Sequence, residues 1–145
     1  MFSARNKAFS DSAEIKQFFD KLLGITHAGI FQAGSIKLRT WNTTYTKYDF
    51  SDLPEALTSF YEEYFLRMNK PVIELENYSW ASRSFDTELH PYSDGCGRLS
   101  RLHGSFFLIR ANLPLPRFDS RASYYCAIGR SFNEFFEYVR HSSQL

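Results

Sequence analysis

Two apolar stretches in the second half of the chain carry its clearest strand signals: GSFFLIRANL, residues 104–113, and RASYYCAIG, residues 121–129. Each is short, rich in apolar and aromatic residues, and bounded by residues that favour turns. The segment that joins them, PLPRFDS (114–120), contains two prolines, which forbid regular strand pairing. The two stretches therefore predict a pair of β-strands with an irregular connection.

Two further strands are predicted nearer the N-terminus, over 25–32 and 35–41. The dipeptide AG separates these runs by the short interval of a β-hairpin. In the second run, side chains alternate between a mainly apolar face and a face with two charges and Trp41. PVIELENYSW (71–80) reads either as a short strand or as an extended connector, so it is a fifth candidate strand.

Three segments have the three- and four-residue spacing of apolar side chains that indicates an amphipathic helix. Each begins with residues typical of a helix N-terminus, either a capping pair or an early proline. The predicted helices and their start signals are 11–24 (Asp11, Glu14), 52–69 (Asp52, Pro54) and 131–139 (Ser131, Glu134).

The order of these elements predicts an α+β fold. Helix, two strands, helix, irregular segment, two strands and helix would give an antiparallel sheet of about five strands with helices packed on it. A chain of 145 residues can bury one hydrophobic core, and neither an internal repeat nor a low-complexity tract divides it. We therefore expect a single domain over 1–145.

The composition narrows the classes of function. The chain has a net charge of +1 at pH 7 and no block of like charge, so it lacks the overall electrostatic footprint of a nucleic-acid-binding protein. No stretch approaches about 18 apolar residues, and the N-terminus has no apolar signal-peptide core. The two cysteines fit a reducing cytosol better than a disulfide-linked secreted scaffold. We therefore expect a cytoplasmic protein that contacts neither nucleic acid nor membrane.

The segment 82–103 is polar, contains glycines and shows little periodicity, which predicts a long loop. Four residues of this segment are candidate metal ligands: His90, Asp94, Cys96 and His103. Structural zinc ligands usually occur in pairs about two to four residues apart. Five residues separate His90 from Cys96 and six separate Cys96 from His103, so no metal site is expected.

Cys96 and His103 have a second interpretation as a nucleophilic pair, since such pairs are recognised by geometry rather than by spacing. The alternative is that Gly95 and Gly97 turn the chain and that the segment is a lid or contact loop. We favour the lid and expect no catalytic residue and no enzyme. No phosphate-binding glycine loop occurs, and no cofactor is expected.

The chain is unusually aromatic, with 15 Phe, 9 Tyr and 2 Trp. Several rings fall on elements that a sheet-and-helix sandwich can bring together around one cavity. Aromatic walls with a few hydroxyl and indole donors are typical of small-molecule pockets. The alternative is that the same rings fill the layer between helix and sheet. The candidate ligand-binding residues are Trp41, Tyr45, Tyr48, Tyr61, Tyr64, Trp80 and Phe85.

Three stretches resemble the N-terminal, autoinducer-binding-type domain of LuxR-family transcription regulators. They are FFDKLLGITHAGIF (18–31), YEEYFLRMNKPV (61–72) and ASYYCAIGRSFNEFFEYV (122–139), and no invariant motif anchors the likeness. The resemblance implies a PAS/GAF-like α-β-α sandwich that takes part in quorum sensing and transcription regulation. It also implies a helix-turn-helix domain after the sensor, whereas this chain ends before one, so an excised or stand-alone sensor domain is expected.

The resemblance also implies positions in a signal pocket. Tyr61 matches the family's pocket tyrosine, Pro71 matches the proline of its Asp-Pro pair, and Trp80 stands near a later tryptophan. Lys70 occupies the place of the aspartate, which accepts the amide N–H of acyl-homoserine lactones. A lysine cannot accept that hydrogen bond, so a different class of signal is expected.

The sequence thus predicts a small-molecule-sensing or signal-binding domain that acts through protein–protein contacts. The expected ligand is a small hydrophobic or amphipathic signal molecule, and the expected protein partner is a second copy of the chain or a regulator. One alternative is a stand-alone interaction module that binds no ligand. A less favoured alternative is a small Cys/His enzyme.

Overall fold

The computed structural model describes residues 9–26, 37–43, 46–70, 73–93 and 95–143. Over these ranges the protein is all-α, with six α-helices, one short 3₁₀ helix and one π-helical turn. In chain order the elements are α1 (Ser12–Thr26), η2 (Phe50–Asp52), α2 (Leu53–Met68), α3 (Glu74–Arg83), η3 (the π-helical turn, Ser84–Leu89), α4 (Cys96–Arg110), α5 (Arg121–Ile128) and α6 (Phe132–Ser142).

The predicted α+β fold, with its antiparallel sheet and its α-β-α sandwich, is wrong. The stretch 104–113 lies mostly in α4, and the stretch 121–129 consists of α5 and the glycine that follows this helix. Within the described ranges the only β-type pairing is an isolated antiparallel bridge between Leu38 and Tyr92. The predicted strand 25–32 and the hairpin turn fall largely outside these ranges, and so does the start of the strand 35–41.

The run Phe106–Leu108 reads as a strand because α4 is buried on two sides. Phe106 and Phe107 pack into one core and Leu108 into another, so consecutive residues are all apolar. Periodicity alone cannot separate such a buried helix from a buried strand. The same holds for 71–80, where α3 replaces the fifth candidate strand from Glu74 onward.

The three predicted helices are confirmed, together with two of their start signals. The Glu14 amide donates to Asp11 Oδ1 at 2.9 Å, and the Glu134 amide donates to Ser131 Oγ at 3.2 Å. α1 continues past Gly24 to Thr26, so this glycine does not end the helix. Asp52 is the N-cap of α2, but its side chain makes no capping bond; the proline in the first turn is the signal that holds there.

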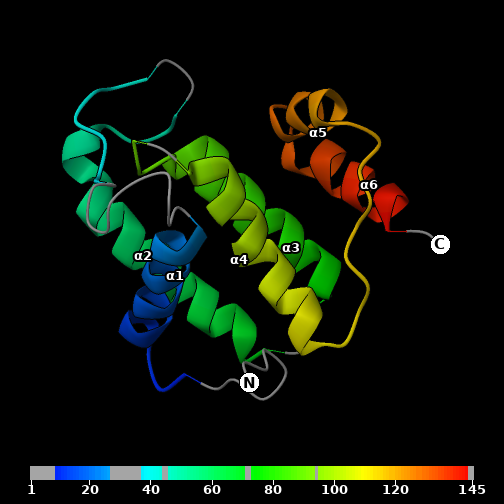
Figure 1. Ribbon diagram of the computed structural model, residues 1–145, viewed down its shortest axis with the longest axis horizontal. Coiled ribbons are helices and arrows are strands. Elements are labelled where there is room, and N and C mark those ends of the chain that lie inside the picture. The colour runs from blue at the N-terminus through cyan, green and yellow to red at the C-terminus, as the bar shows by residue number, and fades with distance from the viewer. Residues whose placement is uncertain (1–8, 27–36, 44–45, 71–72, 94, 144–145) are drawn as a thin grey trace.

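The centre of the molecule is the pair α3 and α4, which lie side by side (Figure 1). α1 and α2 cover one side of this pair, and α5 and α6 cover the other. Each side has its own hydrophobic core. The larger core includes Phe19, Leu57, Phe60, Tyr61, Tyr64, Phe85, Leu99 and Phe107; the smaller includes Tyr78, Leu108, Tyr124, Ile128, Phe135 and Val139.

Small polar residues permit the close packing of α3 against α4. Ser79 and Ser82 are fully buried, and their hydroxyls donate to the carbonyls of Leu75 (2.8 Å) and Tyr78 (2.7 Å) of their own helix. Gly104 of α4 lies against Tyr78 of α3, and a Cβ there would lie 2.9 Å from the Tyr78 carbonyl oxygen. Serines that bond to their own helix backbone can be buried without a partner from elsewhere.

The predicted loop 82–103 is therefore mostly helical. It comprises the end of α3, the π-helical turn Ser84–Leu89, a short connection and the first half of α4. The segment looked like a loop because its buried positions include serine, aspartate and histidine rather than an apolar stripe.

Candidate functional site

A cleft of about 610 Å³ lies between the π-helical turn and α5. Three segments that are distant in sequence line it. Thr46 and Lys47 come from the segment before η2, and Tyr125, Ile128 and Gly129 come from α5 and its end. The remaining lining side chains come from the end of α3, the turn and the residue after it: Arg83, Asp86, Thr87, Glu88 and His90.

The π-helical turn determines how these side chains project into the cleft. The His90 amide donates to the Phe85 carbonyl at 2.8 Å, a bond that spans five residues and closes the wide turn. His90 itself has φ 39° and ψ 58°, the left-handed region that non-glycine residues seldom adopt. π-helical turns and such backbone outliers are frequent at functional sites, so the turn is a candidate binding element.

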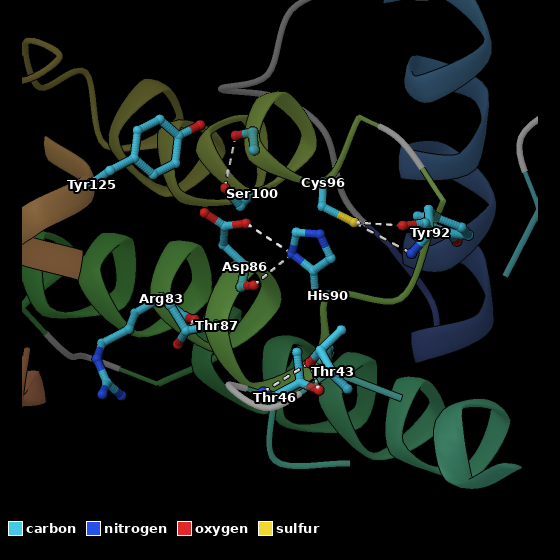
Figure 2. Close-up of polar contacts among 12 residues, drawn as sticks. Thr43, Thr46, Arg83, Asp86, Thr87, His90, Tyr92, Cys96, Ser100 and Tyr125 are labelled. Atoms are coloured by element: carbon cyan, nitrogen blue, oxygen red, sulfur yellow. Dashed lines mark hydrogen bonds and ion pairs between the residues drawn. The ribbon is translucent and has the colours of Figure 1, made fainter. Parts of the chain in front are cut away.

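His90, which follows this turn, pairs with Asp86 within it (Figure 2). His90 Nδ1 lies 2.9 Å from the Asp86 carbonyl oxygen and 3.3 Å from Asp86 Oδ1, and the Asp86 side chain is buried. Because a carbonyl oxygen can only accept, Nδ1 carries the proton and donates. The hydrogen bond to Asp86 raises the pKa of His90 above its ordinary value, although partial burial acts in the opposite direction. The pair thus places a carboxylate and an oriented imidazole together.

A buried arginine holds the segment that carries Thr46 and Lys47 against the turn. Arg39 is almost completely buried, and its partners among the described residues are neutral oxygens. Its Nε donates to the His90 carbonyl at 2.8 Å. Its other strong acceptors are the carbonyls of Trp41 (2.8 Å), Tyr48 (2.7 Å) and Leu89 (3.1 Å). The guanidinium therefore cross-links the segment 39–48 to the turn and fixes the cleft wall.

The opposite wall is held by contacts of three arginines. Arg83 Nε and Nη2 donate to the Arg130 carbonyl at 3.1 and 2.8 Å, which ties the end of α3 to the loop after α5. Arg101 Nη1 lies 3.3 Å from the Tyr125 hydroxyl, and the Arg121 guanidinium lies 5.6 Å from the centre of the Tyr125 ring. Tyr125 is partly exposed and presents an aromatic surface at the cleft.

A smaller pocket of about 170 Å³ lies on the other side of the turn. Its walls are mainly apolar and include Tyr48, Ala56, Phe60, Trp80 and Leu89. The Trp80 and Phe60 rings stack with centroids 5.0 Å apart, and the Arg67 guanidinium lies 4.3 Å from the centre of the Trp80 ring. Glu88 lines both this pocket and the cleft.

The sequence-predicted pocket residues do not share one cavity. Tyr48 and Trp80 line the smaller pocket, whereas Tyr61, Tyr64 and Phe85 are buried in the larger core. The Trp41 side chain is 48% exposed and lines neither described cavity. Tyr45 lies outside the described residues. Ligand binding by these aromatic residues stays a prediction.

The three buried rings surround His103 instead. The Tyr61 hydroxyl lies 2.8 Å from His103 Nε2, His103 Nδ1 lies 2.7 Å from the Leu99 carbonyl, and the Tyr64 hydroxyl donates to the His103 carbonyl at 2.5 Å. The imidazole stacks on Phe19 and Phe85, with centroids 3.8 and 4.4 Å apart. Burial lowers the pKa of His103 to about 3 and raises the pKa of Tyr61. This histidine is a neutral part of the core, out of reach of a substrate.

The interpretation of Cys96 and His103 as a nucleophilic pair has no support in the geometry. Cys96 is the first residue of α4, and His103 lies seven residues, or about two turns, further along the helix. The two residues are therefore about 10 Å apart along the helix axis. Cys96 is buried, and its Sγ lies 3.3 Å from both the amide and the carbonyl of Tyr92 (Figure 2). Among the described residues, no three of His, Cys, Asp and Glu are grouped as metal ligands; Asp94 lies outside that part of the chain.

The cleft residues are absent from the binding residues predicted from the sequence. Arg83, Asp86, Thr87 and His90 recur at three- and four-residue intervals, which places them near one face of a helical turn. That spacing could have been found in the sequence. The polar, glycine-containing composition of 82–103 nevertheless predicts a loop, for which no helical periodicity is expected.

No family model matches this chain, and no curated protein matches it. The resemblance to LuxR-type sensor domains therefore receives no support from these comparisons, and the sheet it implies is not found in the described residues. No helix in the described part of the chain is long and apolar enough to cross a lipid bilayer.

Proposed function

We propose that the protein is a small-molecule-binding domain whose ligand occupies the cleft between the π-helical turn and α5. The observation that carries this proposal is the convergence of a buried carboxylate, an oriented imidazole and an aromatic ring on one cavity of about 610 Å³. Cavities of this size with a few convergent polar groups are the usual form of small-molecule sites.

The charges of the lining favour a ligand with hydrogen-bond donors. The lysine and the arginine of the lining, Lys47 and Arg83, both have partners: Lys47 Nζ lies 3.8 Å from Glu88, and Arg83 donates to the Arg130 carbonyl. The carboxylates of Asp86 and Glu88 can each accept several bonds. Hydroxyl or amine groups on the ligand match these acceptors better than an anionic group does.

Binding rather than catalysis is the better-supported reading of the site. Cys96 and His103, the residues of the alternative enzyme hypothesis, are both buried in α4 and engaged with backbone atoms. The walls of the cleft are held by Arg39 and Arg83, which suits a preformed binding site.

Native mass spectrometry of protein purified from the expressing cells tests this proposal. A co-purifying small molecule, released from wild type but not from Asp86→Asn, is the expected result. Asp119→Asn is the matched control, since Asp119 is exposed on the linker before α5. Saturation-transfer NMR with a mixture of amines, monosaccharides and nucleosides extends the test to ligands lost in purification. If no compound is retained and no compound in the mixture binds, the proposal fails.

A second candidate function is a protein-interaction module, which one surface feature favours. Leu113 and Leu115 are 45% and 48% exposed and alternate with Pro114 and Pro116 in an extended segment between α4 and α5. Exposed apolar side chains on a proline-stiffened segment are suited to contact with another protein. Analytical ultracentrifugation of wild type and of L113S/L115S tests self-association through this segment; an unchanged monomer in both samples argues against it.

A further inference from the structure

The turn Ser84–Leu89 and the segment 46–48 together form a partition between the two cavities. On one side of the partition, Asp86, Thr87 and Thr46 line the cleft. On the other side, Tyr48, Ser84 and Leu89 face the apolar pocket. The Lys47 amide donates to the Glu88 carbonyl at 3.0 Å and joins the two halves of the partition.

Glu88 stands at the edge of this partition and lines both cavities. Its carboxylate pairs with Lys47 Nζ at 3.8 Å, and both side chains are solvent-exposed, Lys47 at 62% and Glu88 at 34%. Such an exposed pair contributes little stability and is readily exchanged for another partner. A ligand that spans both cavities would pass this carboxylate and could replace the lysine with its own cation.

The smaller pocket matches one aromatic ring in size and chemistry. Its volume is about 170 Å³, and Phe60, Trp80 and Leu89 supply apolar walls. An apolar protein cavity of about 150 Å³ is enough to bind benzene. The charged side chains in its lining are Glu63 and Glu88, which pair with Arg67 at 3.3 Å and with Lys47 at 3.8 Å. The lining itself therefore supplies carboxylates and no cationic side chain.

We infer that the two cavities form one site for a cationic amphiphile, in which an amine lies between Asp86 and Glu88 and a single aromatic ring enters the pocket beside Trp80. The inference rests on the proposed function and adds to it the class of ligand. It follows from three observations. Glu88 lines both cavities, the smaller pocket has mainly apolar walls, and Lys47 and Arg83 already have partners within the protein.

Phenylalkylamines of increasing chain length, with ethanolamine as the amine alone, are the probes. Binding measured by two-dimensional NMR should strengthen to a maximum at one chain length, because linked fragments bind more tightly than separate ones. The best phenylalkylamine should exceed ethanolamine by about tenfold or more, or about 1.4 kcal/mol. The Trp80 indole signal should shift with the phenylalkylamines and not with ethanolamine. Trp41, whose side chain lines neither described cavity, is the internal reference.

Two variants separate the two ends of the site. Ala56→Leu fills the apolar pocket and should abolish the advantage of the ring while ethanolamine binds as before; Ala122→Leu, on the exposed face of α5, is the matched control. Asp86→Asn should weaken every amine. Where Ala56→Leu does not fold, the wild-type indole shifts decide the question.

The inference is overturned if the ring adds no affinity, or if the Trp80 signal does not move. Neither result decides the proposed function, which is tested by whether a molecule co-purifies with wild type and is lost in Asp86→Asn. The inference is also overturned if Asp86→Asn does not weaken the binding of the phenylalkylamines. If no probe binds, the amphiphile class is wrong, and the mass-spectrometric test alone decides whether the cleft is a binding site.

Discussion

The Tyr61 hydroxyl donates to Nε2 of His103 across 2.8 Å inside the larger core, where both side chains are almost completely inaccessible to solvent. The donor is assigned from the other ring nitrogen, which faces the Leu99 carbonyl at 2.7 Å and must carry the proton. Through this bond α2 is joined to α4 at the level where Phe19 and Phe85 stack on the imidazole.

Removal of that hydroxyl should destabilise the protein. Tyr61→Phe leaves a buried imidazole nitrogen without a donor, so the free energy of unfolding should fall by about 1–3 kcal/mol. Tyr138→Phe is the control, because its hydroxyl bonds to Ser123 at 2.7 Å on a half-buried ring, where water can replace it. Urea unfolding followed by circular dichroism measures both. Equal losses in the two variants would contradict the special role of the buried bond.

Acid should destabilise the fold through His103. Its pKa in the folded protein is about 3, below the ordinary value of 6.5 that applies to the unfolded chain. Between these values the unfolded state binds more protons, so stability is full above about pH 6.5 and falls by up to about 1.4 kcal/mol per pH unit as the pH drops. His103→Gln should flatten this dependence. An unchanged slope in that variant would assign the effect to other groups.

His90 contributes with the opposite sign. Its pKa is raised in the folded protein, so its stabilising contribution is present below the unfolded value and is lost as the pH rises through the raised pKa. NMR titration of the histidine ring protons separates the two residues: the His90 signal should titrate above pH 6.5, and the His103 signal should not move near neutral pH.

Even a conservative replacement of Arg39 should weaken the cross-link. Arg39→Lys keeps the charge, but it offers one ammonium group where a planar guanidinium donates to acceptors from four residues. The free energy of unfolding should therefore fall by about 1–3 kcal/mol. Arg98→Lys is the control on an exposed side chain. Chemical unfolding gives the stability, and the amide signals of residues 46–48 and 84–90 report the wall. A variant with unchanged signals and unchanged stability would show that the cross-link is dispensable.

Two glycines in helices should respond oppositely to alanine. At Gly104 a Cβ would meet the Tyr78 ring and carbonyl at 2.9 Å, so Gly104→Ala should separate α3 from α4 and destabilise by about 1–3 kcal/mol. At Gly24 no atom lies within 4 Å of the added Cβ, so Gly24→Ala should stabilise α1 by about 0.5 kcal/mol. Thermal unfolding of the two variants side by side is the measurement. A stabilising Gly104→Ala would mean that α3 and α4 are less closely packed.

The two thiols should differ sharply in reactivity. Cys126 is exposed on α5, whereas Cys96 is buried and bonded to the Tyr92 backbone. Titration with a disulfide reagent should modify one thiol in the native protein and two in urea. Cys126→Ser should abolish the native reaction. A fast reaction that persists in this variant would revive the alternative of a nucleophilic Cys96.

Helix starts were more predictable from the sequence than helix interiors. The start signals at Asp11, Pro54 and Ser131 depend on a few adjacent residues, so they could be read without knowledge of the packing. α5 was missed because its capping box uses Ser120 and Ser123 rather than a glutamate. α4 was missed because its burial on two sides removes the polar face on which helical periodicity depends.

The site could be predicted less well than the helix starts, because its residues come together only through helix packing. The aromatic residues were identified, but their distribution between the core and the smaller pocket depends on how α2 and α3 pack. The cleft needs the unusual backbone of the π-helical turn and His90, which no residue type in that segment demands. The buried Arg39 was placed on a charged strand face, whereas carbonyl oxygens, which are invisible in a sequence pattern, surround it.

The central position of α3 and α4 also affects how the protein comes apart. Each helix contributes to both cores, so loss of α5 and α6 would expose one apolar side of the pair while the other side stayed covered by α1 and α2. The backbone amides along this pair are consequently shielded from both directions. Among the described residues, we therefore expect the amides along the contact between α3 and α4 to exchange most slowly with solvent.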